Sequence, residues 1–362
     1  HELKDAFERC QSEALAFFGL GDVYVEEFLP RARHIEVQIL GDASGSIVHF
    51  GDRECSVQRR NQKLVEVAPA PNLAPSLRER MTSAAVSFAQ QEKYMSLGTF
   101  EFLVLDKGVE EDRSTGSATE DHFVFIEANA RLQVEHTVTE EVTGFDLVRG
   151  QIAVAFGSSL TDLGLDAQAP PALSGFAIQA RVNLETITAD GGVRPGSGRL
   201  VRYEPPNGPG VRTDGFGYVG YKTSIAYDSL LAKVIVHERS SNFSDVARKA
   251  IRALSEFHLE GARNNISFLK NILSHEDFIS GATHTRWIEE TVEQLTNEWQ
   301  GPDHFMVAET GGGAEGVSQG SSKREDPLAV FSQQDATGQA APAEPQEIDV
   351  PEGMVSGRAP IP

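Results

Sequence analysis

The chain has 362 residues, enough for two or more domains and a sizeable core. Its net charge of −21 argues against a non-specific nucleic-acid binder, because a phosphate backbone would be repelled. Two cysteines are too few for a disulfide framework and favour a reducing, cytoplasmic setting, and no apolar run reaches the ~20 residues that span a bilayer. We therefore expect neither nucleic acid nor membrane as a partner.

The first hundred residues alternate between predicted helices and strands. Apolar residues at steps of three and four predict a helix over 3–18, which Gly19 and Gly21 end. Strands are predicted at 23–28, 34–40 and 46–50, and the last two form a hairpin with one polar and one apolar face. A second helix over 76–92 follows Pro75, and a strand over 98–106 follows that helix.

The stretch from His122 to His136 carries the most unusual pattern. It begins as a strand, and polar residues then occupy five successive odd positions: Glu127, Asn129, Arg131, Gln133 and Glu135. In an extended backbone these side chains would share one face. Two readings fit, namely a solvated strand face or a site for a charged ligand with a metal.

Two neighbouring features bear on that choice. The strands at 98–106 and from 122 onward are joined by a polar loop over 108–121 and are predicted to pair antiparallel, so Glu101 could face Glu127. Facing carboxylates are destabilising unless they share a cation such as Mg²⁺; alternatively the two acids lie on different faces. Arg59, Arg60 and Lys63 concentrate positive charge, which suits a phosphate or carboxylate ligand or a surface cluster paired with acids.

The second half is predicted as helix 140–156, then a strand over 174–185 that places Arg181 on a polar face. Short strands follow at 199–203, 211–213, 218–221 and 232–237, and helices at 243–258, 265–274 and 286–297. After about Gln300 the composition turns to Gly, Ser, Ala, Pro and acidic residues, with too few apolar residues for a core. We expect a flexible acidic linker there.

Together these motifs resemble the biotin carboxylase component of biotin-dependent carboxylases, in the ATP-grasp superfamily. The matching segments, in the family's order, are 33–38, 53–63, 66–71, 98–102, 127–136, 180–183, 227–233 and 264–269. Two positions depart from the family: Asn61 stands where many members carry His, and Val67 where many carry Glu.

The resemblance implies an α+β fold. An ATP-grasp core, an antiparallel sheet with flanking helices, would occupy 1–165, and a biotin carboxylase C-terminal subdomain 166–298. A disordered tail over 299–362 would lead towards a biotinyl domain. Family members begin with an N-terminal subdomain and a glycine-rich lid, which we expect to be missing before His1. The isolated chain is therefore expected to be inactive.

The same resemblance implies an ATP-dependent carbon–nitrogen ligase. ATP would phosphorylate bicarbonate to carboxyphosphate, whose carboxyl group passes to N1 of biotin. The implied catalytic residues are Glu135 as the base that deprotonates bicarbonate, with Arg131, Arg181 and Lys63. The implied ligands of Mg²⁺ or Mn²⁺ are Glu101, Glu127 and Asn129. The implied contacts to the nucleotide and bicarbonate are Glu26, Leu29, His34, Gln58, Asn61, Gln133 and Val134.

The implied partners are ATP, bicarbonate, a biotinyl carrier domain, a carboxyltransferase domain and a further copy of the chain. Two alternatives stay open. One is another ATP-grasp ligase such as a carbamoyl phosphate synthetase, against which segments 133–136 and 227–229 argue. The other is a truncated piece that serves only in dimerisation. The final carboxyl acceptor, whether acetyl-CoA, propionyl-CoA, pyruvate or urea, does not follow from the sequence.

Overall fold

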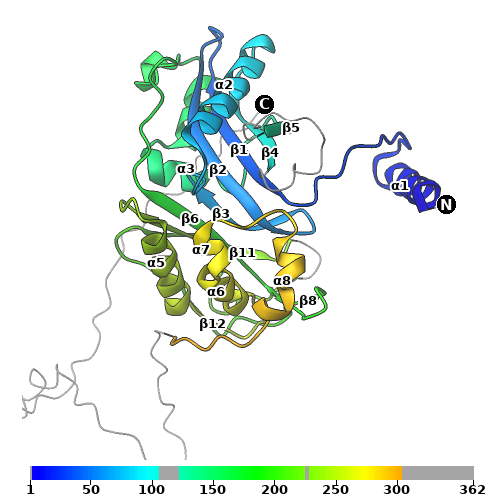
Figure 1. The fold of residues 1–362 in the computed structure, drawn as a ribbon. Helices are drawn as coiled ribbons and strands as arrows, with labels where there is room; N and C mark the ends of the chain where they lie inside the picture. The colour runs from blue at the N-terminus through cyan, green and yellow to red at the C-terminus, as the bar shows by residue number, and fades with distance from the viewer. Residues whose placement is uncertain (1, 106–121, 225–227, 304–362) are drawn as a thin grey trace, which may run out of the picture. The chain divides into compact units, whose positions relative to one another are not determined.

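An eight-stranded antiparallel sheet organises the computed structural model, which describes residues 2–105, 122–224 and 228–303 (Figure 1). Its strands lie in the order β10-β11-β6-β3-β2-β1-β4-β5. Their bounds are β1 (Ala32–Gly41), β2 (Ile47–Arg59), β3 (Gln62–Ala68), β4 (Ser96–Leu105), β5 (His122–Asn129), β6 (Phe176–Asn183), β10 (Val211–Gly215) and β11 (Leu230–Glu238). Strands from both halves of the chain therefore share one sheet. This confirms the predicted α+β class with a large antiparallel sheet.

Two strand pairs and the helices complete the described residues. The pairs are β7 (Glu185–Ile187) with β8 (Val193–Pro195), and β9 (Arg202–Glu204) with β12 (His258–Glu260). The helices are α1 (Glu2–Phe18), α2 (Pro75–Gln91), α3 (His136–Thr143), α4 (Leu147–Ala155), the 3₁₀ turn η2 (Thr161–Leu163), α5 (Phe243–Glu256), α6 (Ile266–Ser274), α7 (Glu276–Ser280) and α8 (Trp287–Leu295). The described residues all belong to one compact unit.

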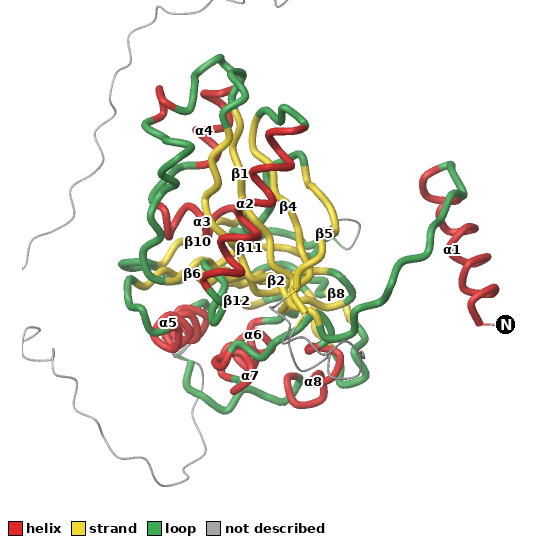
Figure 2. The backbone as a smooth tube through the Cα atoms, turned by 45° about the horizontal axis from the view of Figure 1, so that its top comes forward, coloured by secondary structure: helices red, strands yellow, loops and turns green. Residues whose placement is uncertain are grey.

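Helices cover both faces of the sheet (Figure 2). On one face, α2 buries Leu77, Met81 and Ala85 against the odd-numbered apolar residues of β1. On the other face, α4 contributes Leu147 to a core with Leu40 at the end of β1. Helices α5 and α6 pack against β6 and β11 and form the largest apolar cluster among the described residues.

Strand β1 has the apolar and polar faces predicted for the hairpin, and both are buried. Its odd-numbered face packs on α2, but its even-numbered face is also buried, with His34, Glu36 and Gln38 at 7%, 0% and 0% exposure. Buried polar groups are costly unless hydrogen bonds or opposite charges satisfy them. This polar, buried face forms the floor of the site described below.

Three local predictions were wrong. No strand forms at 23–28 or at 218–221, because no neighbouring strand pairs with either segment. The helix predicted over 140–156 is two helices, since Gly144 adopts a left-handed φ of 71° and donates its N–H to the Glu140 carbonyl at 2.8 Å. Asp146 then caps α4 by accepting the Arg149 N–H at 2.7 Å.

The other predicted helices agree with α1, α2, α5, α6 and α8 to within two residues at each end. The loop predicted over 108–121 and most of the acidic linker lie outside the described residues. The domain boundary at 165/166 stays a prediction. No helix among the described residues is long and apolar enough to cross a membrane.

Replacing Gly144 tests the break between α3 and α4. A Cβ there would meet nothing within 4 Å, so the cost of Gly144→Ala is backbone strain alone. We expect a loss of about 1 kcal/mol in the free energy of unfolding, measured by urea denaturation. Gly144→Asn is the matched control, because Asn tolerates the left-handed region, and it should lose less than Ala. Equal stability of the alanine variant and the parent would contradict this account.

Candidate active site

A cavity of about 740 Å³ opens beside β1, β3, β4 and the end of β5. It brings together all fourteen side chains implicated by the sequence motifs: Glu26, Leu29, His34, Gln58, Asn61, Lys63, Glu101, Glu127, Asn129, Arg131, Gln133, Val134, Glu135 and Arg181. These residues come from six separate stretches of sequence. The stretch 127–135 lines this cavity, in which Glu127 and Arg131 are exposed and Gln133 and Glu135 are buried.

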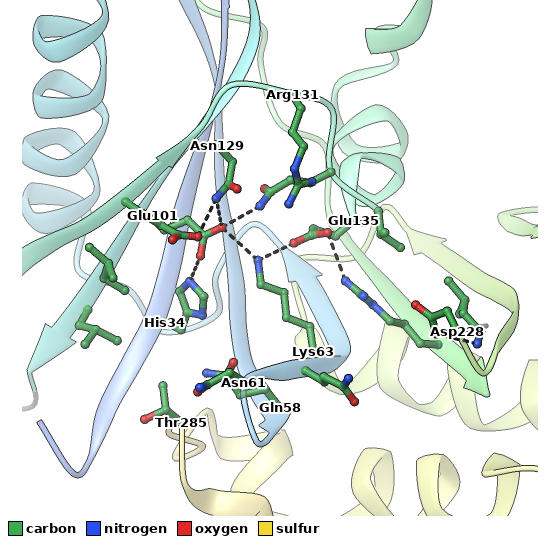
Figure 3. A pocket seen from close by; sticks show the side chains of 18 of the residues that line it. His34, Gln58, Asn61, Lys63, Glu101, Asn129, Arg131, Glu135, Asp228 and Thr285 are labelled. Carbon is green, nitrogen blue, oxygen red and sulfur yellow. Dashed lines mark hydrogen bonds and ion pairs between the residues drawn. The ribbon is translucent and has the colours of Figure 1, made fainter. Parts of the chain in front are cut away.

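One end of the cavity is acidic. Glu101 on β4 directly faces Glu127 on β5, which confirms the predicted register. Asn129 lies between them and donates Nδ2–H to the Oε1 atoms of both, at 2.8 and 2.9 Å (Figure 3). Two carboxylates and an amide oxygen form a donor set that suits Mg²⁺ or Mn²⁺. Asn129 would have to turn its amide by half a turn to offer its oxygen.

The chain after Asn129 leaves the sheet. The strand predicted to continue to Glu135 ends at Asn129, and 130–135 form a turn that leads into α3. The turn closes through the His136 N–H, which donates to the Gln133 carbonyl at 3.3 Å. Gln133 and Glu135 are nonetheless buried in the cavity floor. Arg131 is exposed and donates to the Leu132 carbonyl at 3.3 Å.

Lys63 on β3 occupies the centre of the cavity floor (Figure 3). Its Nζ lies 2.5 Å from Glu135 Oε1, 2.7 Å from Glu36 Oε2 and 3.5 Å from Glu101 Oε1. Burial opposes its charge, but these surrounding anionic groups outweigh burial and raise the pKa of Lys63 above its usual value. Lys63 is therefore a fixed cation that holds three carboxylates.

Arg181 on β6 approaches Glu135 from the other side. Its Nη2 lies 3.2 Å from Glu135 Oε2, and its Nε donates to Glu66 Oε1 at 2.5 Å. Glu66 is fully buried and also accepts from Gln179 at 3.0 Å. Cations and carboxylates thus alternate across the floor in the order Arg53, Glu36, Lys63, Glu135, Arg181 and Glu66.

Two carboxylates of this floor stay ionised. Burial alone would raise the pKa of Glu36, but Arg53 and Lys63 outweigh it and lower that pKa to about 2. Burial opposes ionisation of Glu101 as well, and the hydrogen bond from His34 with the charge of Lys63 lowers its pKa to about 2. His34 Nε2 lies 2.5 Å from Glu101 Oε2.

The opposite end of the cavity is lined by the segment Glu26–Leu29, Gln58, Asn61 and Thr285. The Thr285 N–H donates to the Ala32 carbonyl at 2.9 Å. This hydrogen bond holds the segment before α8 against the start of β1, so that Thr285 lines the cavity. The positive-φ residues Arg60 and Asn61 form the tight turn between β2 and β3.

The basic cluster at Arg59, Arg60 and Lys63 does not act as one unit. Lys63 lies in the cavity, whereas Arg59 donates to the Gly191 carbonyl at 3.0 Å. The Arg60 N–H donates to Glu289 at 3.1 Å, on the side of α8. Of the three residues predicted to bind an anion or to pair with nearby acids, only Lys63 lines the cavity, where it pairs with carboxylates.

Sequence reasoning missed three residues of the floor, namely Glu36, Arg53 and Glu66. Glu36 could have been found, because it lies two residues from His34 on the same side of a strand. Glu66 stands three residues after Lys63 on β3, with no alternation that marks it. Arg53 lacks a local signal, since its partners come from distant segments.

Among the described residues, two groups of side chains have ligand atoms within 4.8 Å of one another: His34 with Glu36 and Glu101, and Glu36 with Cys55 and Glu135. Both include Glu36, whose two oxygens already accept from Arg53 and Lys63. A metal at either group would compete with two buried cations. The Glu101–Glu127–Asn129 end is therefore the better metal site.

Comparison with known proteins agrees with this geometry. Residues 1–163 match the family model described as the ATP-binding domain of the carbamoyl-phosphate synthase L chain, and residues 179–290 match the biotin carboxylase C-terminal domain. The fold is thus that of an ATP-grasp ligase. The second family model and the relatives described below all identify the biotin carboxylase branch of these ligases. The chain therefore belongs to the biotin carboxylase family.

Mitochondrial pyruvate carboxylase from Homo sapiens is 46% identical over 293 residues, which are 81% of this chain and 23% of that protein. Pyruvate carboxylase from Staphylococcus aureus is 43% identical over 81% of this chain and 24% of its own length. The chain therefore spans about a quarter of the length of these curated relatives.

Among solved structures, the biotin carboxylase domain dimer of Hydrogenobacter thermophilus 2-oxoglutarate carboxylase has a TM-score of 0.73 and 36% identity. The match covers 81% of this chain and 60% of that one, which was solved with MgADP, ADP and bicarbonate. The carbamoyl phosphate synthetase alternative is supported only by the name of the first family model.

The buried charges predict a marked loss of stability in acid. A carboxyl group whose pKa is about 2 when folded and 4.5 when unfolded stabilises the fold above pH 4.5 and loses that effect as the pH falls towards 2. For Glu36 this amounts to on the order of 3 kcal/mol. We expect the free energy of unfolding, measured by urea denaturation, to fall steeply between pH 4.5 and 2.5.

The matched variant is Glu36→Gln. At pH 7 it leaves Arg53 and Lys63 without their shared anion, so we expect it to lose about 3–5 kcal/mol. Its stability should then vary less with pH than that of the parent. A parent protein whose stability is constant from pH 5 to 2.5 would contradict the charge assignment.

Proposed function

We propose that the chain provides the metal, bicarbonate and biotin side of a biotin carboxylase, which carboxylates biotin with bicarbonate and ATP through carboxyphosphate. The observation that carries this proposal is the position of Glu135 between Lys63 and Arg181, in the same cavity as the facing pair Glu101 and Glu127. A base, two cations and a metal site in one cavity are what this reaction needs.

Phosphoryl transfer to bicarbonate gathers several negative charges in one place. When bound at Glu101, Glu127 and Asn129, Mg²⁺ would offset the charge of the phosphate oxygens and orient them. The adenine and ribose would lie at the other end, against the segment Glu26–Leu29, Gln58 and Asn61, and the ribose would also approach His34, which contacts Glu101. With the nucleotide in this orientation, its terminal phosphate would lie between the acidic end and Lys63.

Glu135 would act as the base that removes the bicarbonate proton. Each of its oxygens now contacts one cation, Oε1 with Lys63 and Oε2 with Arg181. A bicarbonate that enters beside Glu135 would replace one of these contacts, so that the freed oxygen receives the proton. Gln133, Val134 and Arg131 would form the wall around the bicarbonate.

Arg181 would have a second role after carboxyphosphate has formed, in the transfer of the carboxyl group to biotin. Biotin N1 is a weak nucleophile until its proton leaves, and negative charge then develops on the ureido oxygen. A guanidinium beside that oxygen stabilises the charge. Glu66 contacts both Nε and Nη2 of Arg181, and Nη2 also reaches Glu135 at 3.2 Å, on the cavity side.

The wider assembly is part of the same proposal. The relatives carry this region in longer carboxylases, and the Hydrogenobacter domain is a dimer. By analogy, a biotinyl carrier domain would bring biotin to the cavity, a carboxyltransferase domain would receive the carboxyl group, and a second copy would pair with this chain. The relatives include carboxylases of pyruvate, 2-oxoglutarate and long-chain acyl-CoA, so the proposal stops at biotin.

Glu135→Gln tests the base. The amide keeps the size of the carboxylate but cannot take a proton and can accept from only one of the two cations, so we expect bicarbonate- and biotin-dependent ATP cleavage to fall at least about 10²-fold. MgADP binding should persist. The assay measures ADP release in a chain joined to the N-terminal part of a biotin carboxylase domain, since the solved domains extend beyond the matched region.

Glu79→Gln, on the exposed side of α2, is the control and should retain activity. A Glu135→Gln protein with more than half the parent activity would contradict the role of Glu135. A parent protein that forms dimers but shows no bicarbonate-dependent ATP cleavage would instead favour the dimerisation alternative.

A further inference from the structure

Arg53 on β2 is fully buried and belongs to none of the roles described above. It does not line the cavity, so it is not a catalytic residue. Its guanidinium nevertheless donates to five side chains from four segments, β1, β4, the turn before α3, and α3: Glu36 at 2.5 Å, Gln38 at 2.8 Å, Thr139 at 3.0 Å, Gln133 at 3.2 Å and Thr99 at 3.3 Å. Two of these partners, Glu36 and Gln133, in turn contact residues that line the cavity.

The first branch runs through Gln133 to the metal end. Arg53 Nη2 donates to Gln133 Oε1, and Gln133 Nε2 donates to Glu101 Oε1 at 2.7 Å. The reversed amide would place its NH₂ against the guanidinium and its oxygen against the carboxylate, and both contacts would be repulsive. Arg53 therefore decides which group of Gln133 faces Glu101.

The second branch runs through Glu36 to the bicarbonate end. Arg53 Nε holds Glu36 Oε1, and Glu36 Oε2 holds Lys63, which also contacts Glu135. Without the guanidinium, Glu36 would be a buried carboxylate with one cation shared among three acids. Burial would then favour its neutral form, and Lys63 would lose its anchor.

We propose that Arg53 is a positioning residue that aligns both ends of the site, by directing the Gln133 amide towards Glu101 and by fixing Glu36 against Lys63. This inference rests on the proposed function, because it assumes that Glu101 binds the metal. Partners that orient a metal ligand typically change metal affinity by about 10–100-fold when they are removed. Arg53 acts on Glu101 through Gln133, which contacts both side chains.

Arg33 offers a matched control on the neighbouring strand. It makes a partly buried pair with Glu54, at 2.6 and 2.8 Å, and donates to the Pro71 carbonyl at 2.7 Å. Neither Arg33 nor Glu54 nor Pro71 lines the cavity. A lysine at either arginine position keeps the charge but cannot reproduce the planar fork of donors. A purely structural role of Arg53 would give the two lysine variants similar properties.

The test measures the dissociation constant of Mn²⁺ for the full chain in the presence of ADP, by electron paramagnetic resonance, together with the melting temperature. We expect Arg53→Lys to bind Mn²⁺ about tenfold more weakly than the parent, and Arg33→Lys to stay within about twofold. Equal Mn²⁺ affinities of Arg53→Lys and Arg33→Lys would overturn the proposal.

Gln133→Met provides a second, independent readout. It removes both contacts of the relay, so we expect about the same tenfold loss, and the double variant with Arg53→Lys should lose no more than either single variant. If Arg53→Lys does not fold, Mn²⁺ binding by Gln133→Met tests the route through Gln133 by itself. Additive losses, or unchanged binding in Gln133→Met, would overturn the route through Gln133.

Glu127→Gln separates this inference from the proposed function. If the parent binds Mn²⁺ and Glu127→Gln abolishes binding, the metal end is supported, and the Arg53 variants then judge the positioning role alone. If Glu127→Gln binds Mn²⁺ as the parent does, or if the parent binds none, the metal assignment fails and the inference fails with it.

Discussion

The structure of the site depends on one constraint: carboxylates and cations must alternate across a floor that is almost closed to water. Glu36 and Arg53 are fully buried, and neither charge could be placed there alone, because an unpaired buried ion costs several kcal/mol. Each internal member of the series therefore contacts two neighbours of opposite charge. A buried ionic network contributes less to stability than an apolar core of the same volume would, so its presence indicates a chemical purpose.

That purpose is visible in where the network reaches the cavity. The two ends of the series, Arg53 and Glu66, do not line the cavity and contact only other side chains. Lys63, Glu135 and Arg181 line the cavity and can exchange a neighbouring side chain for a ligand. This series of three cations and three carboxylates is close to neutral by itself. In the proposed function, the facing pair Glu101 and Glu127 would hold a cation at the cavity's acidic end.

The sequence predicted the members of this site better than its shape. Glu101 and Glu127 were recognisable because strand alternation and a hairpin connection place them opposite each other. The residues from Arg131 to Glu135 were predicted on a strand but lie in a turn, and Arg131, Gln133 and Glu135 still line one cavity, since a turn and a strand can both bring alternate residues to it. Arg53 could not be found, because five partners from distant segments define its position, and Gly144 was overlooked inside an apparently continuous helical pattern.

A crystal structure of the chain with MgADP and bicarbonate would test the central claim most directly. The account predicts a metal bound to carboxylate oxygens of both Glu101 and Glu127 at about 2.1 Å. It also predicts a bicarbonate beside Glu135 that has replaced either the Lys63 or the Arg181 contact, while Arg53 and Glu66 keep their partners. A metal bound away from this facing pair, or a Glu135 turned out of the cavity with both cations paired elsewhere, would contradict it.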